Sequence, residues 1–408
     1  MGNNGAANGP AGAGFSGTKN PFVVALVVGT RPEVIKLAPV LWAIERRPEF
    51  GHAKIVSTSQ QRDLVAQALS DLKIKPTMQL TLDEGQRGDL GTQLGAMLGG
   101  FKEVLAALSP SLIVVQGDTS SAFAGAVAGF YAGIPVAHVE AGLRTTRVTS
   151  PFPEEMHRRL IAGLTTLHFA PTKVAAANLL REGVAPNRVA VVGNPVVDAL
   201  LNTPTVDEWR IGRDHEEQLL VITVHRRESW GGILREIAAS IRDAIERHPK
   251  LHVVWPLHAN PAVQTVIRQQ LRDPRIHLYG PLPYTRFLSL MRAATLILTD
   301  SGGVQEEAHT LGIPALVVRD ETERVEAIGV GLTIIGRERK EILTALNAAL
   351  TAPSYPRARS VTNVFGDGRA GDRIIQAISR WWNGLEPLLT AAEEFGGSEF
   401  AAPPCNEV

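Results

Sequence analysis

The chain has 408 residues, 44% of them hydrophobic and 20% charged, so it can bury a large core and its length favours at least two domains. Lysine plus arginine and aspartate plus glutamate both number 41, which excludes a global basic field that would attract nucleic acid or anionic lipid. The single cysteine, Cys405, excludes an intramolecular disulfide framework and a metal-thiolate site, and it indicates a reducing compartment.

The N-terminal residues 1–20 are rich in Gly, Ala and Asn and lack the basic start and apolar core of a signal peptide. We expect them to form a disordered tail. No apolar run in the chain approaches the roughly 20 residues that a membrane-spanning helix needs. These features predict a soluble, cytoplasmic protein with no membrane partner.

Short runs rich in Val, Ile and Leu alternate with helical patterns, which is typical of parallel sheets built from βαβ units. The polar, turn-rich stretch 203–218 divides the runs into two sets, as a linker would. We therefore predict an α/β fold with two doubly wound, Rossmann-like domains, 21–200 and 201–366, facing a cleft. A helical segment over 367–390 and a loose tail over 391–408 follow. The expected strands lie within 21–28, 53–59, 111–118, 134–140, 167–172, 188–195, 219–225, 251–258, 275–282, 296–302, 314–320 and 332–336.

Polar residues directly after the predicted strands are candidates for a site, because ligands of open α/β sheets lie beyond the carboxyl ends of the strands. Thr30 and Glu33 have the spacing of a capping box, which predicts a helix start there. A structural role remains an alternative for single members of the set: Lys36 on a solvated helix face, or Asp118 as a helix N-cap. The candidates are Arg31, Lys36, Asp118, Glu140, Arg144, His225, His258, Ser301, Gly302 and Gly303.

Several candidates are carboxylates. Asp118 and Glu140 follow strands, whereas Glu154 and Glu155 open a predicted helix. Carboxylates that face one cleft perturb one another's pKa values, so that one site can hold both an acid and a base. Acids in the first turn of a helix can instead complement its dipole, and for Glu155 we favour that interpretation.

The stretch SGGVQEE begins at Ser301 and runs from a predicted strand into a predicted helix. Gly302 and Gly303 would let a phosphate approach the amides of the helix N-terminus. Glu306 and Glu307 follow about one turn later, where one could reach the ribose of a nucleotide while the other complements the dipole as a first-turn acid. No predicted strand is followed by G-x-G-x-x-G and no Walker A pattern occurs, so neither a redox dinucleotide nor ATP is indicated.

Nine ordered motifs span roughly residues 22–380: GTRPEVIKLAPV, QGDTSSAFA, PVAHVEAGLRT, PFPEEMHR, VVGNPVVDAL, VHRRESWG, TDSGGVQEEA, LGIPALVVRDETERVEA and FGDGRAGDRI. Together they resemble those of the non-hydrolysing UDP-N-acetylglucosamine 2-epimerases. The resemblance implies a glycosyltransferase-B-like fold, with the nucleotide held mainly by the second domain and the C-terminal helix crossing back to the first. It also implies a homodimer that needs no cofactor and no catalytic metal.

The resemblance implies a reaction: UDP-GlcNAc and UDP-ManNAc would interconvert by anti elimination of UDP to a 2-acetamidoglycal and re-addition, supplying surface polysaccharide synthesis. Which acid serves which face of the sugar stays open. Carried over by motif, the resemblance implies that Asp118, Glu140 and Glu154 do the acid/base chemistry and that Arg31 and Lys36 are their cationic partners. It implies that His225 assists the leaving diphosphate, that Glu307 binds the ribose, and that the phosphates are bound by Ser301, Gly302 and Gly303.

One motif departs from the family pattern. Many bacterial members read Q-H-R-x-M in a region that contributes to an allosteric substrate site, whereas this chain has Gln61 at the histidine position. The change argues against allosteric activation, although Arg144 and His258 would leave a partial second site. A different substrate, such as a UDP-2,3-diacetamido-hexuronic acid, is an alternative explanation. A glycosyltransferase of the same fold and a nucleotide-sugar-binding protein without catalysis are the rival functions.

Overall fold

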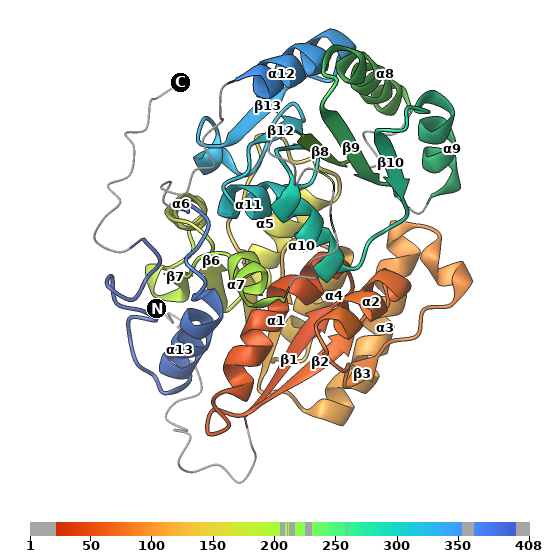
Figure 1. The fold of residues 1–408 in the computed structure, drawn as a ribbon. Helices are drawn as coiled ribbons and strands as arrows, with labels where there is room; N and C mark the ends of the chain where they lie inside the picture. The colour runs from red at the N-terminus through yellow and green to blue at the C-terminus, as the bar shows by residue number, and fades with distance from the viewer. Residues whose placement is uncertain are drawn as a thin grey trace. The chain divides into compact units, whose positions relative to one another are not determined.

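The computed structural model divides the chain into two compact units (Figure 1). Unit 1 comprises Met1–Leu201 and Phe365–Val408, and unit 2 comprises Asn202–Val364. The structure describes residues 22–204, 209, 211, 217–224, 231–258, 260–352 and 363–396.

Unit 1 is built on a parallel sheet with the strand order β3-β2-β1-β4-β5-β6-β7. In its register, Leu26 of β1 lies between Ile55 of β2 and Val114 of β4, and all three side chains are buried. The order reverses between β1 and β4, so the loops after these two strands form the switch point where ligands of such sheets bind. The strands are β1 (Val23–Val28), β2 (His52–Ser57), β3 (Met78–Gln79), β4 (Leu112–Gln116), β5 (Val136–Val139), β6 (Leu167–Ala170) and β7 (Val189–Val191).

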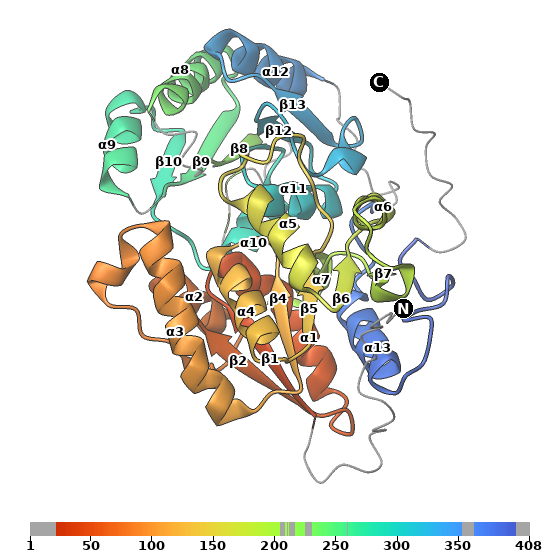
Figure 2. The ribbon, with the colours of Figure 1, turned by 180° about the vertical axis from the view of Figure 1, so that it is seen from behind.

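Helices cover both faces of the unit 1 sheet. One hydrophobic cluster joins it to α1, α2 and α13, which lie in front in Figure 1, and another joins it to α3, α4 and α5, which lie in front in Figure 2. The elements are α1 (Arg31–Glu45), α2 (Arg62–Asp71), η1 (Glu84–Arg87), α3 (Leu90–Leu108), α4 (Ser120–Tyr131), α5 (Glu154–Leu164), α6 (Lys173–Arg181), η2 (Pro186–Arg188), α7 (Pro195–Asn202) and α13 (Ala370–Trp382).

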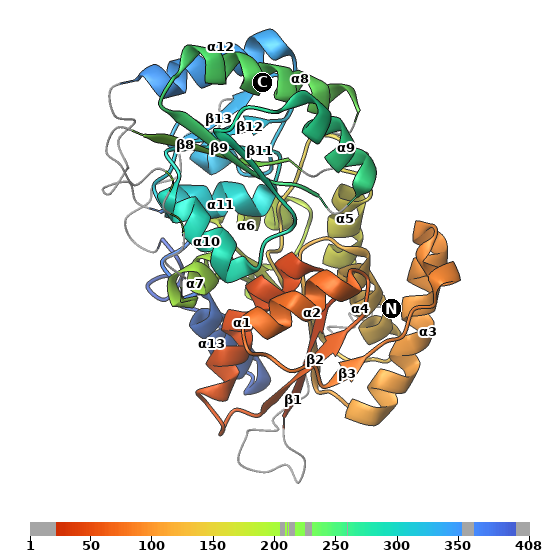
Figure 3. The ribbon, with the colours of Figure 1, turned by 45° about the vertical axis from the view of Figure 1, so that its right-hand side comes forward.

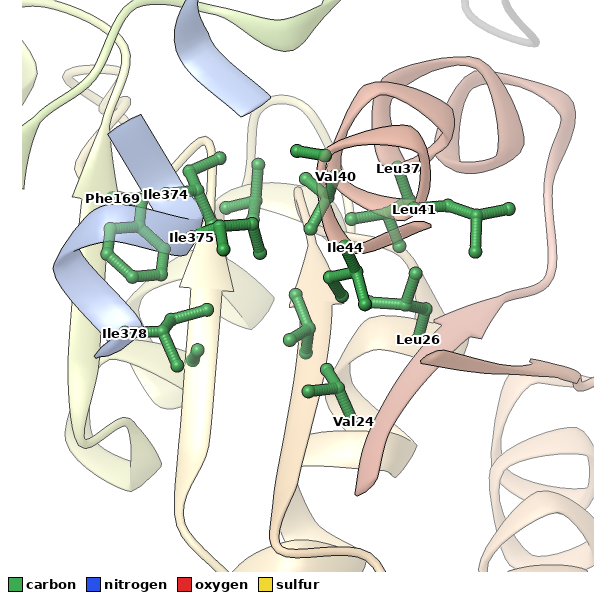
Figure 4. Packing of buried hydrophobic residues seen from close by; sticks show 14 of the residues in the cluster. Val24, Leu26, Leu37, Val40, Leu41, Ile44, Phe169, Ile374, Ile375 and Ile378 are labelled. Carbon is green, nitrogen blue, oxygen red and sulfur yellow. The ribbon is translucent and has the colours of Figure 1, made fainter. Parts of the chain in front are cut away.

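The helix α13 is distant in sequence from the rest of unit 1 but shares its core. Ile374, Ile375 and Ile378 form one apolar stripe at helical spacing, and all three are buried. Figure 4 shows this stripe in the same cluster as Phe169 of β6 and Val40 of α1. Burying an aliphatic side chain contributes roughly 1.5 to 3 kcal/mol, so the stripe fixes this segment of the chain to unit 1.

Unit 2 holds a parallel sheet with the order β10-β9-β8-β11-β12-β13, which reverses between β8 and β11. One hydrophobic cluster packs α8, α9 and α12 on one face, and α10 and α11 lie on the other (Figure 3). The elements are β8 (Gln218–Thr223), α8 (Gly232–Arg247), β9 (Leu251–Pro256), α9 (Pro261–Gln270), β10 (Ile276–Tyr279), α10 (Tyr284–Ala293), β11 (Leu296–Thr299), α11 (Gly302–Thr310), β12 (Ala315–Val318), η4 (Val325–Ala327), β13 (Leu332–Ile335) and α12 (Arg339–Thr351).

The predicted fold class is confirmed: two α/β units each hold a doubly wound parallel sheet. Every predicted strand run overlaps an observed strand. One observed strand was not predicted from the sequence: β3, Met78–Gln79, a two-residue strand at the edge of the sheet. Two residues are too few for an apolar run or an alternation to show. Within the described residues, no helix combines the length and the apolar character that crossing a membrane requires.

Candidate active site

The loops after β1 and β4 are joined by the buried side chain of Glu33 in α1. Its Oε2 accepts hydrogen bonds from the backbone amides of Gly29 (2.9 Å) and Thr30 (2.7 Å). Its Oε1 accepts a hydrogen bond from the Thr119 hydroxyl (2.6 Å) on the loop after β4. The contact with Thr30 is the one that the capping-box spacing predicts. Burial raises the pKa of Glu33 to about 7, although these hydrogen bonds act in the opposite direction.

This pKa makes stability depend on pH. Between the ordinary value of 4.5 and about 7, folded protein keeps a proton on Glu33 that the unfolded chain releases, so stability falls as pH rises through this window. Across this window, the raised pKa of Glu33 lowers the free energy of unfolding by on the order of 3 kcal/mol, at about 1.4 kcal/mol per pKa unit. We expect Glu33→Gln to flatten the dependence of the thermal midpoint on pH between 5 and 8. The curve will not be fully flat, because burial also raises the pKa of Asp198, to about 6. Burial lowers the pKa of His138 to about 4 and of His168 to about 3, so these two histidines add stability as pH rises toward 6.5. Equal slopes in wild type and variant would contradict the assignment.

Glu140 follows β5 and is held by side chains from three other parts of unit 1. Its Oε1 lies 2.5 Å from Lys36 Nζ and accepts a hydrogen bond from Asn194 Nδ2 (3.2 Å), while its Oε2 accepts one from Gln116 Nε2. A Cβ atom on Gly117 would lie 3.5 Å from Glu140 Oε2. The carboxylate of Glu140 therefore lies beside the loop that carries Asp118.

Asp118 follows β4 and is more open than Glu140, with its side chain 31% exposed. Its Oδ2 lies 3.0 Å from Nε of the buried Arg158, and its carbonyl oxygen is hydrogen-bonded to Nδ1 of His157 (2.9 Å). The alternative in which Asp118 caps a helix is wrong, because Thr119 is the N-cap of α4 and accepts from the amide of Ala122 (3.0 Å). Asp118 is thus an oriented carboxylate that remains accessible to solvent.

A buried histidine fixes the backbone just before Asp118. His138 in β5 shares a 2.7 Å hydrogen bond between its Nε2 and the Gly117 carbonyl, so this nitrogen carries the proton and donates it. Burial lowers the pKa of His138 to about 4, so the ring is neutral near pH 7. It acts as a fixed donor to the loop and not as a cation.

The helix α5 presents Glu154 and Glu155 in its first turn. Glu154 is partly buried, whereas Glu155 is completely buried and makes ion pairs with Arg158 (Nη1 to Oε2, 3.2 Å) and Arg159 (Nε to Oε1, 2.9 Å). Its Oε2 also accepts from the amide of Thr145 (3.1 Å). The interpretation of Glu155 as an acid that only complements the helix dipole understates its role, because Arg158 links it to Asp118.

The remaining candidate cations of unit 1 differ in their surroundings. Arg31 is the first residue of α1 and is partly exposed. Arg144 donates from Nε and Nη2 to the two carboxylate oxygens of Glu182 (2.8 and 2.6 Å) and from Nη1 to the Leu143 carbonyl (2.8 Å). The structure therefore groups Lys36 with Glu140, and Arg144 with Glu182.

In unit 2, the stretch SGGVQEE forms the start of α11, with Ser301 as its N-cap. The Ser301 amide donates to Thr299 Oγ1 (2.9 Å). A Cβ atom on Gly302 would lie 2.7 Å from Nη1 of Arg324, so the absence of a side chain here accommodates a guanidinium. At Gly303, by contrast, a Cβ atom would meet nothing within 4 Å. Of these two glycines, Gly303 is the one with open space beside its α-carbon.

Glu306 and Glu307 are not first-turn acids, because α11 begins at Gly302. The expectation that one of them serves the dipole in this way is wrong. Glu306 Oε1 accepts from Nε of Arg324 (2.9 Å), and Glu307 Oε1 accepts from the hydroxyl of Tyr284 (3.0 Å). Both acids are buried, so each is held by a partner within unit 2.

Two histidine candidates belong to unit 2. His258 follows β9, and its Nδ1 accepts from the amide of Asn260 (3.1 Å). His225 lies outside the described residues. Among the residues that the structure describes, no group of three or more His, Cys, Asp or Glu side chains has a geometry suited to a metal ion.

Several side chains that orient the candidate carboxylates were not identified from the sequence: Gln116, Asn194, Arg158 and Tyr284. Arg158 had a readable signal, since it lies four residues after Glu154 and three after Glu155 on one helix face. Gln116 was placed in a predicted strand directly before the candidate loop. Asn194 and Tyr284 carry no local signal for the contacts that they make.

The chain matches known proteins over most of its length. The family model described as UDP-N-acetylglucosamine 2-epimerase matches residues 43–379. A Yersinia pestis protein named UDP-N-acetylglucosamine 2-epimerase is 40% identical over 369 residues, which cover 87% of this chain and 98% of the relative.

Two solved structures extend the match to the fold. A UDP-GlcNAc 2-epimerase from Neisseria meningitidis, bound to UDP-GlcNAc, is 35% identical with a TM-score of 0.81 and covers 88% of this chain and 98% of its own. The S. aureus protein MnaA, solved with UDP, is 35% identical with a TM-score of 0.82 and covers 89% and 97%. The match therefore runs through both units, and the chain belongs to the UDP-N-acetylglucosamine 2-epimerase family.

Proposed function

We propose that this protein interconverts UDP-GlcNAc and UDP-ManNAc without hydrolysis, by anti elimination of UDP and re-addition through a 2-acetamidoglycal. The observation that carries the proposal is the pairing of oriented carboxylates with cations at the switch point of unit 1. Asp118 lies against Arg158, and Glu140 lies against Lys36. Removal of the C2 proton needs a base, and its return to the opposite face needs an acid, so a site with separate carboxylates suits the reaction.

The C2 proton of the sugar is weakly acidic, so its removal must be assisted by departure of UDP with oxocarbenium character at C1. Asp118 is the carboxylate best placed to exchange a proton, because it is the more exposed of the two. We propose Glu154 as the third member of the acid/base group, at the start of α5. The assignment of each acid to one face of C2 stays open.

We propose that unit 2 holds the nucleotide. The open space at Gly303 and the N-terminal amides of α11 suit a diphosphate, which the helix dipole favours. Glu307, held by Tyr284, suits a ribose hydroxyl. Ser301 and Gly302 complete the phosphate-binding turn, and His225 and Arg31 are proposed to balance charge on the leaving UDP. The relatives solved with UDP and with UDP-GlcNAc support a UDP-sugar as the substrate.

Incubation with UDP-GlcNAc in deuterium oxide tests the proposal. We expect a manno epimer that carries deuterium at C2, with no net accumulation of free UDP or free ManNAc. Accumulation of free ManNAc and UDP would indicate a hydrolysing enzyme. Exchange only with a UDP-2,3-diacetamido-hexuronic acid would assign the alternative substrate. UDP release that depends on an added sugar acceptor, without exchange at C2, would favour a glycosyltransferase.

We also propose that the UDP-ManNAc supplies surface polysaccharide synthesis.

We further propose that the protein is a homodimer. Phe130 and Tyr131 at the end of α4, and Met156 and Leu160 on α5, are exposed apolar side chains of unit 1. Exposed apolar patches commonly mark interfaces, and a second copy of the chain is the partner that we propose. Sedimentation at several concentrations would reveal whether a dimer or a monomer prevails.

A further inference from the structure

The side chains around Glu140 present donors to both of its carboxylate oxygens. Lys36 comes from α1, Gln116 from the end of β4, and Asn194 from the segment after β7. Lys36 and Asn194 donate to Oε1, and Gln116 donates to Oε2. All four side chains are buried. Three elements distant in sequence thus converge on one carboxylate.

The orientation of the Asn194 amide follows from a second contact. Its Oδ1 accepts a hydrogen bond from the amide of Val196 (3.1 Å) in α7, so its Nδ2 must face Glu140. Amide nitrogens and a lysine ammonium cannot accept a proton from a carboxylic acid. A proton on either oxygen of Glu140 would face one of these donors, so a neutral Glu140 would lose at least one hydrogen bond, and the surroundings favour the ionised form.

The backbone at Glu140 indicates that this orientation is maintained at a cost. Its φ is +66°, in the left-handed region that residues with a side chain rarely adopt. Such a conformation is strained and persists where the surrounding structure imposes it. The donors supplied by Lys36, Gln116 and Asn194 are contacts that can offset this cost.

We propose that Asn194 and Gln116 are positioning residues, which act with Lys36 to hold Glu140 as an oriented, ionised carboxylate during the reaction at C2. The proposal rests on the proposed epimerase function. It assigns Glu140 a fixed negative charge next to the reacting sugar, where it can stabilise oxocarbenium character or act as a base. Neither amide needs to touch the substrate for this role.

The substitution Asn194→Asp tests the proposed role of Asn194 as a hydrogen-bond donor to Glu140. The new carboxylate keeps an oxygen that can accept from Val196, so the start of α7 is preserved. It replaces the donor to Glu140 by a second carboxylate about 3 Å away, and like charges at that distance oppose ionisation of both. We expect kcat near pH 7 to fall about 100-fold, with KM and the affinity for UDP within about twofold of wild type. The ascending limb of the pH–rate profile should move to higher pH, because Glu140 must be ionised to function.

Two further variants control the experiment. Asn187→Asp makes the same change at an exposed amide that donates to a carboxylate, Glu386 Oε1 (2.9 Å), and we expect wild-type kinetics. Gln116→Met removes the other donor without adding charge, and it should also lower kcat while leaving KM unchanged. It tests the proposal if Asn194→Asp does not fold. Wild-type kcat and pH profile in either folded variant of the Glu140 network would overturn the proposal.

A measurement without substrate separates this inference from the proposed function. In Asn194→Asp, folded protein should keep a proton shared between the two buried carboxylates, so its thermal midpoint should fall, relative to wild type, as pH rises from 5 to 8. Asn187→Asp should follow wild type. Absence of this dependence would show that Glu140 carries no charge there and would overturn the inference, whichever sugar nucleotide the enzyme uses.

Discussion

Asp118→Asn is expected to abolish epimerisation and deuterium exchange at C2 while leaving the fold and the binding of UDP intact. The amide has almost the same shape as the carboxylate, so it can occupy the same place beside Nε of Arg158, which lies 3.0 Å from Asp118 Oδ2. An amide cannot take up or return a proton near neutral pH, so the chemical step alone is removed. We expect a loss in kcat of about 1,000-fold or more, since general acid–base catalysis contributes about 100- to 10,000-fold.

The matched control is Asp372→Asn. Asp372 is also in unit 1 and has similar exposure, 37%, and its Oδ1 contacts Arg46 (3.0 Å) and Arg47 (2.8 Å). It is an aspartate paired with arginine at the start of α13, outside the proposed site, so kcat should not change. Binding of UDP, measured by calorimetry, should be the same in all three proteins. Near-normal turnover of Asp118→Asn would remove Asp118 from the acid/base group.

The fold could be predicted because its signals are local. A buried parallel strand is a short run of Val, Ile and Leu, and such runs marked every strand except β3. The same logic brought Asp118 and Glu140 forward as candidates. Carboxyl ends of parallel strands meet at one edge of a sheet, so residues that follow neighbouring strands β4 and β5 lie on adjacent loops.

The partners of these carboxylates could not be predicted in the same way. Lys36 and Glu140 are separated by 104 residues, and Asn194 and Glu140 by 54, so no local pattern records either contact. Local patterns also gave the wrong positions for two acids relative to the start of a helix. The structure begins α11 at Gly302, which moves Glu306 and Glu307 beyond the first turn and gives them Arg324 and Tyr284 as partners.

Arg158 is expected to contribute both to the stability of unit 1 and to the proposed chemistry. Its side chain is 2% exposed and lies between Asp118 (Nε to Oδ2, 3.0 Å) and Glu155 (Nη1 to Oε2, 3.2 Å). Glu155 is completely buried, so its charge depends on cationic and hydrogen-bonding partners. One guanidinium thus neutralises a buried acid and orients an accessible one.

We therefore expect Arg158→Met to lower the free energy of unfolding by about 3 kcal/mol, because removing one partner of a buried ion pair leaves a buried charge poorly compensated. Turnover by the protein that remains folded should also fall, since Asp118 loses the group that orients it. Arg158→Lys should recover only part of either property, because a single ammonium cannot span two carboxylates as a planar guanidinium does. Denaturant titrations and initial rates measure the two effects.

Arg159→Met is the matched control for Arg158→Met. Arg159 contacts the same Glu155 (Nε to Oε1, 2.9 Å) but its side chain is 37% exposed. In this variant Glu155 keeps Arg158 and the amide of Thr145 as partners, and water can reach the place that Arg159 leaves. We therefore expect a much smaller loss of stability than in Arg158→Met, and turnover near that of wild type. Equal losses in Arg158→Met and Arg159→Met would show that the effect comes from Glu155 alone. A stable Arg158→Met with normal turnover would show that Asp118 needs no partner in α5 to be held in place.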